Sequence, residues 1–321
     1  MEQGVAVTND LSPPNPPPSQ PHVTRRRVLG LGVLGVGVVA GAGAGLFELV
    51  DHSVLPGHQV LVNLLGRCDV TVPPSTYAPL GPSESGTFFS QARHQTVGYT
   101  IAYPPGHGPG DVLPLVIALH GFGANHTNAL AGISLGQALA LEVGGRPLSP
   151  MAMVAVDGGG GYWHAHPHDD SLGMLTHELL PLCQSKGLGV APEKVGVIGV
   201  SMGGYGALNL AEHEPHLIAA VAAVSPAVWT SYAEAHGANP GAFGSAEEFA
   251  ANDVIAHVDS LRGIPVRISS GLDDPFHPGV EALVRVVPSG TEVDIRKGCH
   301  DGKFFGSAQP AAIAFLNRHL T

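Results

Sequence analysis

Cysteine is scarce in this chain. The 321 residues contain three cysteines, Cys68, Cys183 and Cys299. Three are too few for a disulfide scaffold, and their spacing matches no zinc-binding pattern. In an exported protein two of them could pair and leave the third free, but the sequence does not indicate which two.

Charged residues are also few. They make up 13% of the chain, against 44% apolar residues, and this composition favours a large buried core. The formal net charge is −11, and all of it arises after residue 50, because the arginines and acidic residues before that point cancel. An acidic body argues against nucleic acid as a partner, since binding phosphates requires a surface rich in lysine and arginine. It argues equally against tight docking on anionic lipid headgroups.

The N-terminal region has the features of an export segment. Residues 1–23 are polar and rich in proline, which predicts disorder. Within residues 24–50, three arginines, Arg25–Arg27, precede an uncharged apolar run, Val28–Phe47. A basic stretch before such a run is typical of an export signal. Paired arginines before a glycine-rich run favour the twin-arginine export machinery, the alternative being an ordinary signal anchor.

The fate of this signal stays open. The apolar run is long enough to span a bilayer, which takes about 20 residues, and would then be a membrane anchor. Small residues at Ala40–Ala42 and Ala42–Ala44 also suit a signal peptidase. We therefore expect an exported protein that is either secreted or anchored to the outer face of the cell membrane.

Strand-like and helix-like patterns alternate along the rest of the chain. Residues 51–94 show no clear period and are expected to form an irregular lead-in. The strands expected after it are Thr96–Tyr103, Leu113–Leu119, Met151–Val156, Val195–Val200, Ala219–Val224, Val266–Ser270 and Val293–Arg296. Helices are expected near Asn128–Val143, Leu172–Lys186, Gly203–Glu214, Ala246–Ala251, Val280–Val286 and Ser307–His319. This alternation predicts one α/β domain over residues 95–321, with a mainly parallel sheet covered by helices on both faces.

The strongest chemical signal is the run GVSMGG at residues 199–204, between an expected strand and an expected helix. A G-x-S-x-G run in that context is typical of a nucleophile elbow. Side chains at Gly199 and Gly203 would collide with the neighbouring strand and helix. The turn places Ser201 at the start of a helix, whose positive end favours a developing anion. We therefore predict that Ser201 is the nucleophile rather than a chance serine in a glycine-rich turn.

A second run, HGFG at residues 120–123, follows an earlier expected strand. In folds with a nucleophile elbow, an H-G-x-G loop at this place supplies a backbone donor to the oxyanion hole. We assign the two donors as the backbone N–H groups of Met202 and Phe122. Each would point at the carbonyl oxygen of a substrate as that oxygen becomes negative.

The last two expected strands are followed by GLDDP at residues 271–275 and GCHD at residues 298–301. Serine, aspartate and histidine then occur in the chain order of an α/β-hydrolase triad. We predict that His300 is the general base. Asp274 is preferred to Asp273 as its partner because it stands directly before the proline that ends the strand. Asp301 is expected to be a solvated neighbour.

The run HAHPHDD at residues 164–170 invites a metal interpretation. Its order differs from the H-x-H-x-D-H of metallo-β-lactamase-like sites, and its proline restricts how neighbouring ligands converge. We therefore expect no metal and no cofactor. The run is interpreted as a polar loop at the edge of the sheet. We expect it to line the substrate cleft with Tyr162 and Trp163, and His120 to contact substrate as well; the alternative is a plain surface loop.

Taken together, these motifs give the chain a resemblance to the esterase branch of the α/β-hydrolases, over roughly residues 95–320. The branch includes esterase D, feruloyl-type esterases and secreted mycolyltransferases. The resemblance rests on GVSMGGYGA from Gly199, on the GLDD run and on GCHDGKFF from Gly298. It implies a serine esterase that forms an acyl-enzyme on Ser201, which water or another hydroxyl then resolves.

Three functions follow as hypotheses. The first is an exported esterase acting on a small-molecule or lipid ester. The second is an acyltransferase that uses the same triad with a different acceptor. The HG loop and the low number of tryptophans, Trp163 and Trp229, favour the first over a mycolyltransferase. The third, a non-catalytic binding protein, is disfavoured because every triad position is filled.

Overall fold

The computed structural model describes residues 65–72, 74–190 and 194–321. The expectations for the polar N-terminus at 1–23, the export segment at 24–50 and the first part of the lead-in lie outside the described residues. Within the described ranges, no helix is both long enough and apolar enough to cross a membrane.

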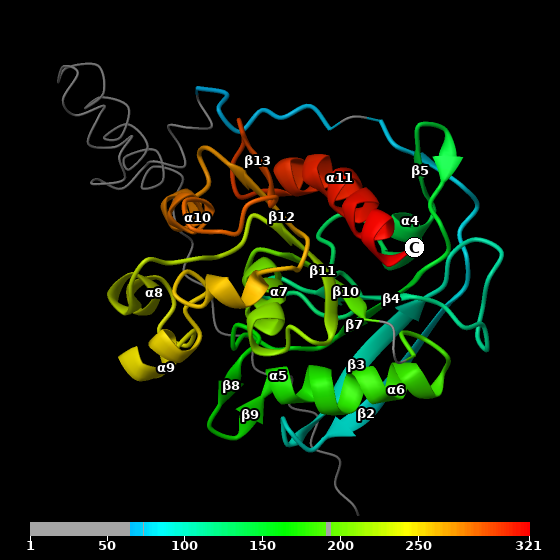
Figure 1. Cartoon of the computed structure of the whole chain (residues 1–321), viewed down its shortest axis with the longest axis horizontal. Helices are drawn as coiled ribbons and strands as arrows, with labels where there is room; N and C mark the ends of the chain where they lie inside the picture. The colour runs from blue at the N-terminus through cyan, green and yellow to red at the C-terminus, as the bar shows by residue number, and fades with distance from the viewer. Residues whose placement is uncertain (1–64, 73, 191–193) are drawn as a thin grey trace, which may run out of the picture. The chain divides into compact units, whose positions relative to one another are not determined.

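An eight-stranded sheet forms the centre of the fold (Figure 1), in the order β13-β12-β11-β10-β4-β7-β3-β2. Six strands run parallel, and the hairpin of β2 and β3 adds an antiparallel edge. The strands are β2 (Ser83–Ser90), β3 (Gln95–Ala102), β4 (Leu115–Leu119), β7 (Ala152–Val156), β10 (Val195–Val200), β11 (Ile218–Val224), β12 (Val266–Gly271) and β13 (Glu292–Arg296). Strands β4, β7 and β10 are buried throughout, as continuous apolar strands in a parallel sheet must be.

Helices cover both faces of this sheet. They are α4 (Leu135–Leu139), α5 (Ser171–Met174), the π-helical turn η1 (Leu175–Leu179), α6 (Leu180–Ser185), α7 (Met202–His213), α8 (Tyr232–Ala238), α9 (Ala246–Ala251), the 3-10 helix η2 (Val258–Leu261), α10 (His277–Val284) and α11 (Gly302–Leu320). Alternate residues of β4 enter different apolar clusters. Leu115 and Ile117 pack with residues of α6 and α7, and Val116 and Ala118 with residues of α4 and α11. Figure 1 shows α11 and the α5–α6 segment on opposite sides.

The predicted α/β architecture is confirmed, and each expected strand is present with its ends shifted by at most two residues. The expected start of the domain at residue 95 is wrong. Strand β2 lies in the region predicted as irregular and pairs with β3 from Ser83↔Ala102 to Ser90↔Gln95. Its exposed and half-buried positions alternate at the edge of the sheet, so its sequence lacks the apolar run by which the other strands were recognised.

The helix expected near Asn128–Val143 is also largely wrong. Only α4 is helical, and Leu141–Val143 forms strand β5, which pairs with β1 (Thr76–Tyr77) and β6 (Arg146–Pro147). Gly132 has a φ of 122°, which breaks the helical pattern before α4. Ser134 then caps α4 in a reciprocal capping box with Gln137. A remaining short hairpin joins β8 (Ala165–His166) to β9 (Asp169–Asp170).

One buried acid in α7 gives this fold a pH dependence. Glu212 is 7% exposed, and neither of its carboxylate oxygens has a hydrogen-bond partner among the described residues. Burial, with a smaller contribution from Asp253, raises the pKa of Glu212 from 4.5 to about 9. Because the folded-state pKa is the higher one, the stabilising effect of the protonated acid is complete below about pH 4.5 and is lost as the pH rises toward 9.

We expect Glu212→Gln to raise the free energy of unfolding by about 2 to 4 kcal/mol near pH 8 and to change it little near pH 5. Urea denaturation at the two pH values measures both effects. Glu281→Gln is the matched control, because the Glu281 side chain is 54% exposed. An equal stability change of Glu212→Gln at both pH values would contradict the assigned pKa.

Candidate active site

The nucleophile elbow forms between β10 and α7. Ser201 has φ 58° and ψ −120°, a backbone conformation that is costly for a residue with a side chain. Its N–H donates to the Val224 carbonyl (2.9 Å), and its carbonyl accepts from the Ala227 N–H (3.1 Å). Strand β11 and the loop after it therefore hold the strained residue in place.

The glycines of the elbow are required sterically. A Cβ at Gly199 would lie 1.9 Å from the Gly203 carbonyl oxygen, and a Cβ at Gly203 would lie 1.9 Å from the Leu119 carbonyl oxygen. No side chain fits at either place. The steric role predicted for both glycines is thus confirmed.

A hydrogen-bonded chain links the three residues predicted as the triad. His300 Nε2 is 2.8 Å from Ser201 Oγ, and His300 Nδ1 is 2.8 Å from Asp274 Oδ2. The Asp274 side chain is fully buried, and its other oxygen accepts from the Phe276 N–H (2.9 Å). An ionised carboxylate can only accept, so it keeps a hydrogen on His300 Nδ1 and leaves Nε2 free to receive the serine proton.

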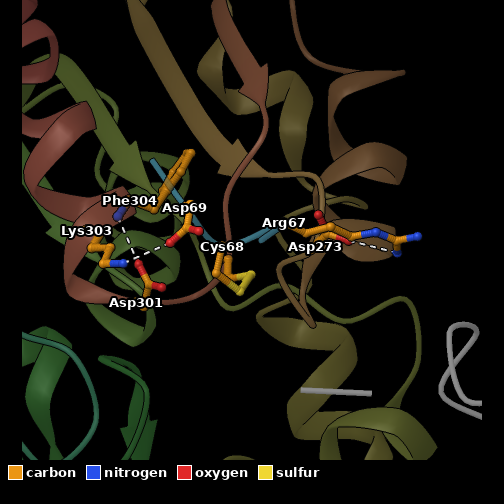
Figure 2. The surroundings of a disulfide bond; sticks show 8 residues. Arg67, Cys68, Asp69, Asp273, Asp301, Lys303 and Phe304 are labelled. Atoms are coloured by element: carbon orange, nitrogen blue, oxygen red, sulfur yellow. Dashed lines mark hydrogen bonds and ion pairs between the residues drawn. A yellow bond between two sulfur atoms is a disulfide. The ribbon is translucent and has the colours of Figure 1, made fainter. Parts of the chain in front are cut away.

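The two neighbouring acids, Asp273 and Asp301, contact residues of the surrounding loops and do not bind the His300 imidazole. Asp273 Oδ1 lies 3.4 Å from Arg67 Nη1, and its N–H donates to a backbone carbonyl. Asp301 was expected to be solvated, but its carboxylate accepts from the Phe304 N–H (2.9 Å) and caps the start of α11. Both contacts are drawn in Figure 2.

A disulfide fastens the loop of the catalytic histidine. Cys68 is bonded to Cys299, the residue before His300, with their Cα atoms 4.9 Å apart. The next residue of the same segment, Asp69, pairs with Lys303 (3.1 Å), so consecutive residues bind both triad loops (Figure 2). This bond identifies which two of the three cysteines pair, a question that the sequence alone left open. Cys183 is the free cysteine of the described residues, and burial raises the pKa of its thiol to about 12.

The two predicted oxyanion donors lie in segments next to Ser201. Met202 is the first residue of α7, and a Cβ at Gly121, just before Phe122, would lie 3.6 Å from Ser201 Cβ. Among the described residues, neither the Met202 nor the Phe122 N–H donates to a protein acceptor. Both N–H groups are thus available to a substrate oxygen, next to the positive end of a 12-residue helix.

His120, Tyr162 and Trp163 lie below the surface, contrary to the prediction that they contact substrate. His120 Nε2 accepts from the Gly158 N–H (2.9 Å), and Nδ1 donates to the Gly121 carbonyl (2.8 Å). Burial lowers the pKa of His120, in keeping with this neutral tautomer. Trp163 donates to the His120 carbonyl (3.1 Å), and Tyr162 packs among other aromatic rings. These side chains are occupied in supporting the oxyanion loop and the core.

The residues of the histidine-rich run 164–170 contact several different partners. Asp169 makes a two-pronged ion pair with Arg93 (2.6 and 3.0 Å). Asp170 caps the start of α5. His164 is fully buried, and His166 is partly buried beside it. The run therefore organises its own loop, and its expected place along a substrate cleft stays a prediction.

The elbow, the hydrogen-bonded Ser–His–Asp chain and the mainly parallel sheet define a serine hydrolase of the α/β-hydrolase fold. The chain belongs to the family described as Putative esterase, whose model matches residues 90–286. Membership places it among the carboxylic ester hydrolases and confirms the predicted family resemblance.

Solved structures share the fold. A ferulic acid esterase is 18% identical, with a TM-score of 0.58 over 74% of this chain and 98% of its own. An S-formylglutathione hydrolase from Agrobacterium tumefaciens is 17% identical, with a TM-score of 0.59 over 78% of this chain and 100% of its own. The fluorophosphonate-binding serine hydrolase F of Staphylococcus aureus is 16% identical, with a TM-score of 0.56 over 74% of this chain and 99% of its own. Comparison with curated proteins finds no match.

We expect Asp274→Asn to lower kcat/KM by about 10³- to 10⁴-fold, because asparagine cannot fix the required tautomer of His300. Asp273→Asn is the matched control and should cost less than about tenfold, since that carboxylate contacts Arg67 instead. Initial rates on p-nitrophenyl acetate measure both, with circular dichroism to verify folding. A larger loss in Asp273→Asn would reverse the assignment.

Proposed function

We propose that this protein is an exported esterase that cleaves carboxylic esters through an acyl-enzyme on Ser201. The observation that carries the proposal is the 2.8 Å contact between Ser201 Oγ and His300 Nε2, with the imidazole held from behind by buried Asp274. A neutral histidine in this position can take the hydroxyl proton at the moment the oxygen attacks.

The reaction follows from these positions. Ser201 Oγ forms a bond to the carbonyl carbon while its proton passes to His300 Nε2. The carbonyl oxygen becomes negative and accepts hydrogen bonds from the N–H groups of Met202 and Phe122. The intermediate collapses, and His300 protonates the departing alcohol. Water then attacks the acyl-enzyme, gives a proton to His300, and releases the acid as Ser201 regains its hydrogen.

Apolar side chains beside this machinery favour a substrate with an apolar acyl or aryl group. The Phe122 side chain, on the oxyanion loop, is 63% exposed, and Leu272, on the loop of Asp274, is 53% exposed. A structural neighbour from Anaeromyces mucronatus holds ferulic acid, an aryl acid. We therefore propose a small-molecule or lipid ester as substrate, with water as the acyl acceptor.

Two observations support export. The first is the run of three arginines, Arg25–Arg27, before the apolar stretch. The second is the Cys68–Cys299 disulfide, because disulfides persist mainly in oxidising compartments outside the cytosol.

Ser201→Ala should remove hydrolysis of p-nitrophenyl acetate, butyrate and octanoate by about 10⁴-fold or more, and should abolish labelling by a fluorophosphonate. Thermal unfolding should stay within a few degrees of the parent protein. If more than a few per cent of the activity survives, another residue is the nucleophile. Mass spectrometry with an added alcohol shows whether free acid or transferred ester dominates, and a dominant ester would replace the esterase by an acyltransferase.

Replacing the arginine pair with Arg25→Lys/Arg26→Lys should block export of the folded enzyme, because the twin-arginine machinery reads those guanidinium groups. Immunoblots of cytosolic, membrane and external fractions measure the distribution. Arg27→Lys alone is the control and should leave export intact. Unchanged export of the double variant would assign the protein to the general secretory route.

A further inference from the structure

Three side chains that commonly bind metals meet away from the triad. His164 directly precedes hairpin strand β8, and His166 lies in that strand. Glu248 lies in α9. Glu248 Oε1 is 2.8 Å from His166 Nδ1 and 3.5 Å from His164 Nδ1. One potential ligand atom from each residue lies within 4.8 Å of the others. From the sequence we considered a metal at the run 164–170 and rejected it. Glu248 stands far along the chain and could not be recognised as a third ligand from that run.

The far nitrogen of each imidazole is already engaged. His164 Nε2 is 2.8 Å from the Ala242 carbonyl oxygen, and His166 Nε2 is 2.8 Å from the Gly161 carbonyl oxygen. A carbonyl oxygen only accepts, so both Nε2 atoms carry the hydrogen. A neutral ring then presents a lone pair at Nδ1. Both Nδ1 atoms lie near Glu248 Oε1, and His164 Nδ1 lies also 3.2 Å from the Ala165 carbonyl oxygen, a contact that metal binding would replace.

A buried carboxylate oxygen lies at the centre of this cluster. Glu248 Oε1 is buried and has no hydrogen-bond partner among the described residues, while Oε2 accepts from the Gly244 N–H (2.6 Å). The two imidazole rings lie side by side, with their centroids 4.2 Å apart. A cation at the centre would meet two ring nitrogens and this carboxylate oxygen.

We propose that His164 Nδ1, His166 Nδ1 and Glu248 Oε1 bind a divalent transition metal at a structural site. Two imidazoles and one carboxylate, completed by water, suit Zn²⁺. Tetrahedral ligands at bonds of about 2.0–2.1 Å lie ~3.4 Å apart. The 3.5 Å between His164 Nδ1 and Glu248 Oε1 matches this separation, and the 2.8 Å between His166 Nδ1 and Glu248 Oε1 would have to lengthen when the metal binds. The two carbonyls on the Nε2–H groups are the outer partners that orient metal-bound histidines.

The proposed site would join two loops of the fold. The metal would connect hairpin β8–β9 to α9, which belongs to the long connection between β11 and β12. His164 stacks on Phe243, with ring centroids 4.9 Å apart and planes at 8°. Phe243 contacts Trp229, which contacts Phe276, and that ring lies against His300. None of the three ligands has a part in the ester reaction, so the metal would support the fold rather than the chemistry.

The test uses the untagged full-length protein, incubated with Zn²⁺ and then dialysed. Inductively coupled plasma mass spectrometry should find about one zinc per chain, and less than about 0.2 in His166→Ala and in Glu248→Gln. His168→Ala, a histidine of the same run outside the cluster, is the matched control and should retain the metal. EDTA should lower the Tm of the parent protein by about 5 °C or more and leave that of Glu248→Gln unchanged.

Equal zinc content in the parent and in both ligand variants would overturn the proposal. So would a parent protein that holds no metal after incubation with Zn²⁺, Co²⁺ or Mn²⁺, in which case the cluster is an ion pair of Glu248 with protonated His166. Glu248→Gln keeps the shape of the side chain, so it gives a readout even if His166→Ala fails to fold. Ser201→Ala should bind as much zinc as the parent protein, which separates this test from that of the esterase.

Discussion

The active site depends on places where two backbones pass too closely for any side chain between them. At the elbow, α7 begins against β10 and the end of β4, and only glycine fits at residues 199 and 203. A similarly close backbone contact holds the loops of Asp274 and His300. A Cβ at Gly271 would lie 2.2 Å from the Gly298 carbonyl oxygen, so the loops that carry the acid and the base are also in direct backbone contact. These contacts place three side chains, distant in sequence, within hydrogen-bond reach.

His120, at the start of the oxyanion loop, links that loop to residues of the core. His120 receives a hydrogen bond from the chain after β7, and its carbonyl receives one from Trp163. Because the ring is neutral and buried, it acts as a fixed link between two loops and adds no charge near the oxyanion donors. The loop that approaches Ser201 is therefore held by His120 and Trp163, which are buried in the core.

Much of the site could be predicted because its signals are local. Continuous apolar runs marked the buried strands β4, β7 and β10, and Ser201 follows the last of these. Asp274 and His300 follow β12 and β13, strands of mixed polar and apolar residues that were still recognisable from their pattern. Features set by distant contacts could not be read in this way. The partner of Asp273 is Arg67, in a segment without periodicity, and strand β2 lies at an edge where few apolar residues are needed. The burial of Trp163 depends equally on packing against glycines that come close only in the folded chain.

The disulfide has a consequence for proteolysis. Cys68 and Cys299 are 231 residues apart, so the bond closes most of the described chain into one covalent ring. A single protease cut inside the ring, in an exposed loop, opens the ring but releases no fragment. Such nicked molecules would migrate as one species without reductant and as two with it. The ring thus keeps the elbow and the catalytic histidine on one molecule after a first cut, which would protect an enzyme exported as proposed.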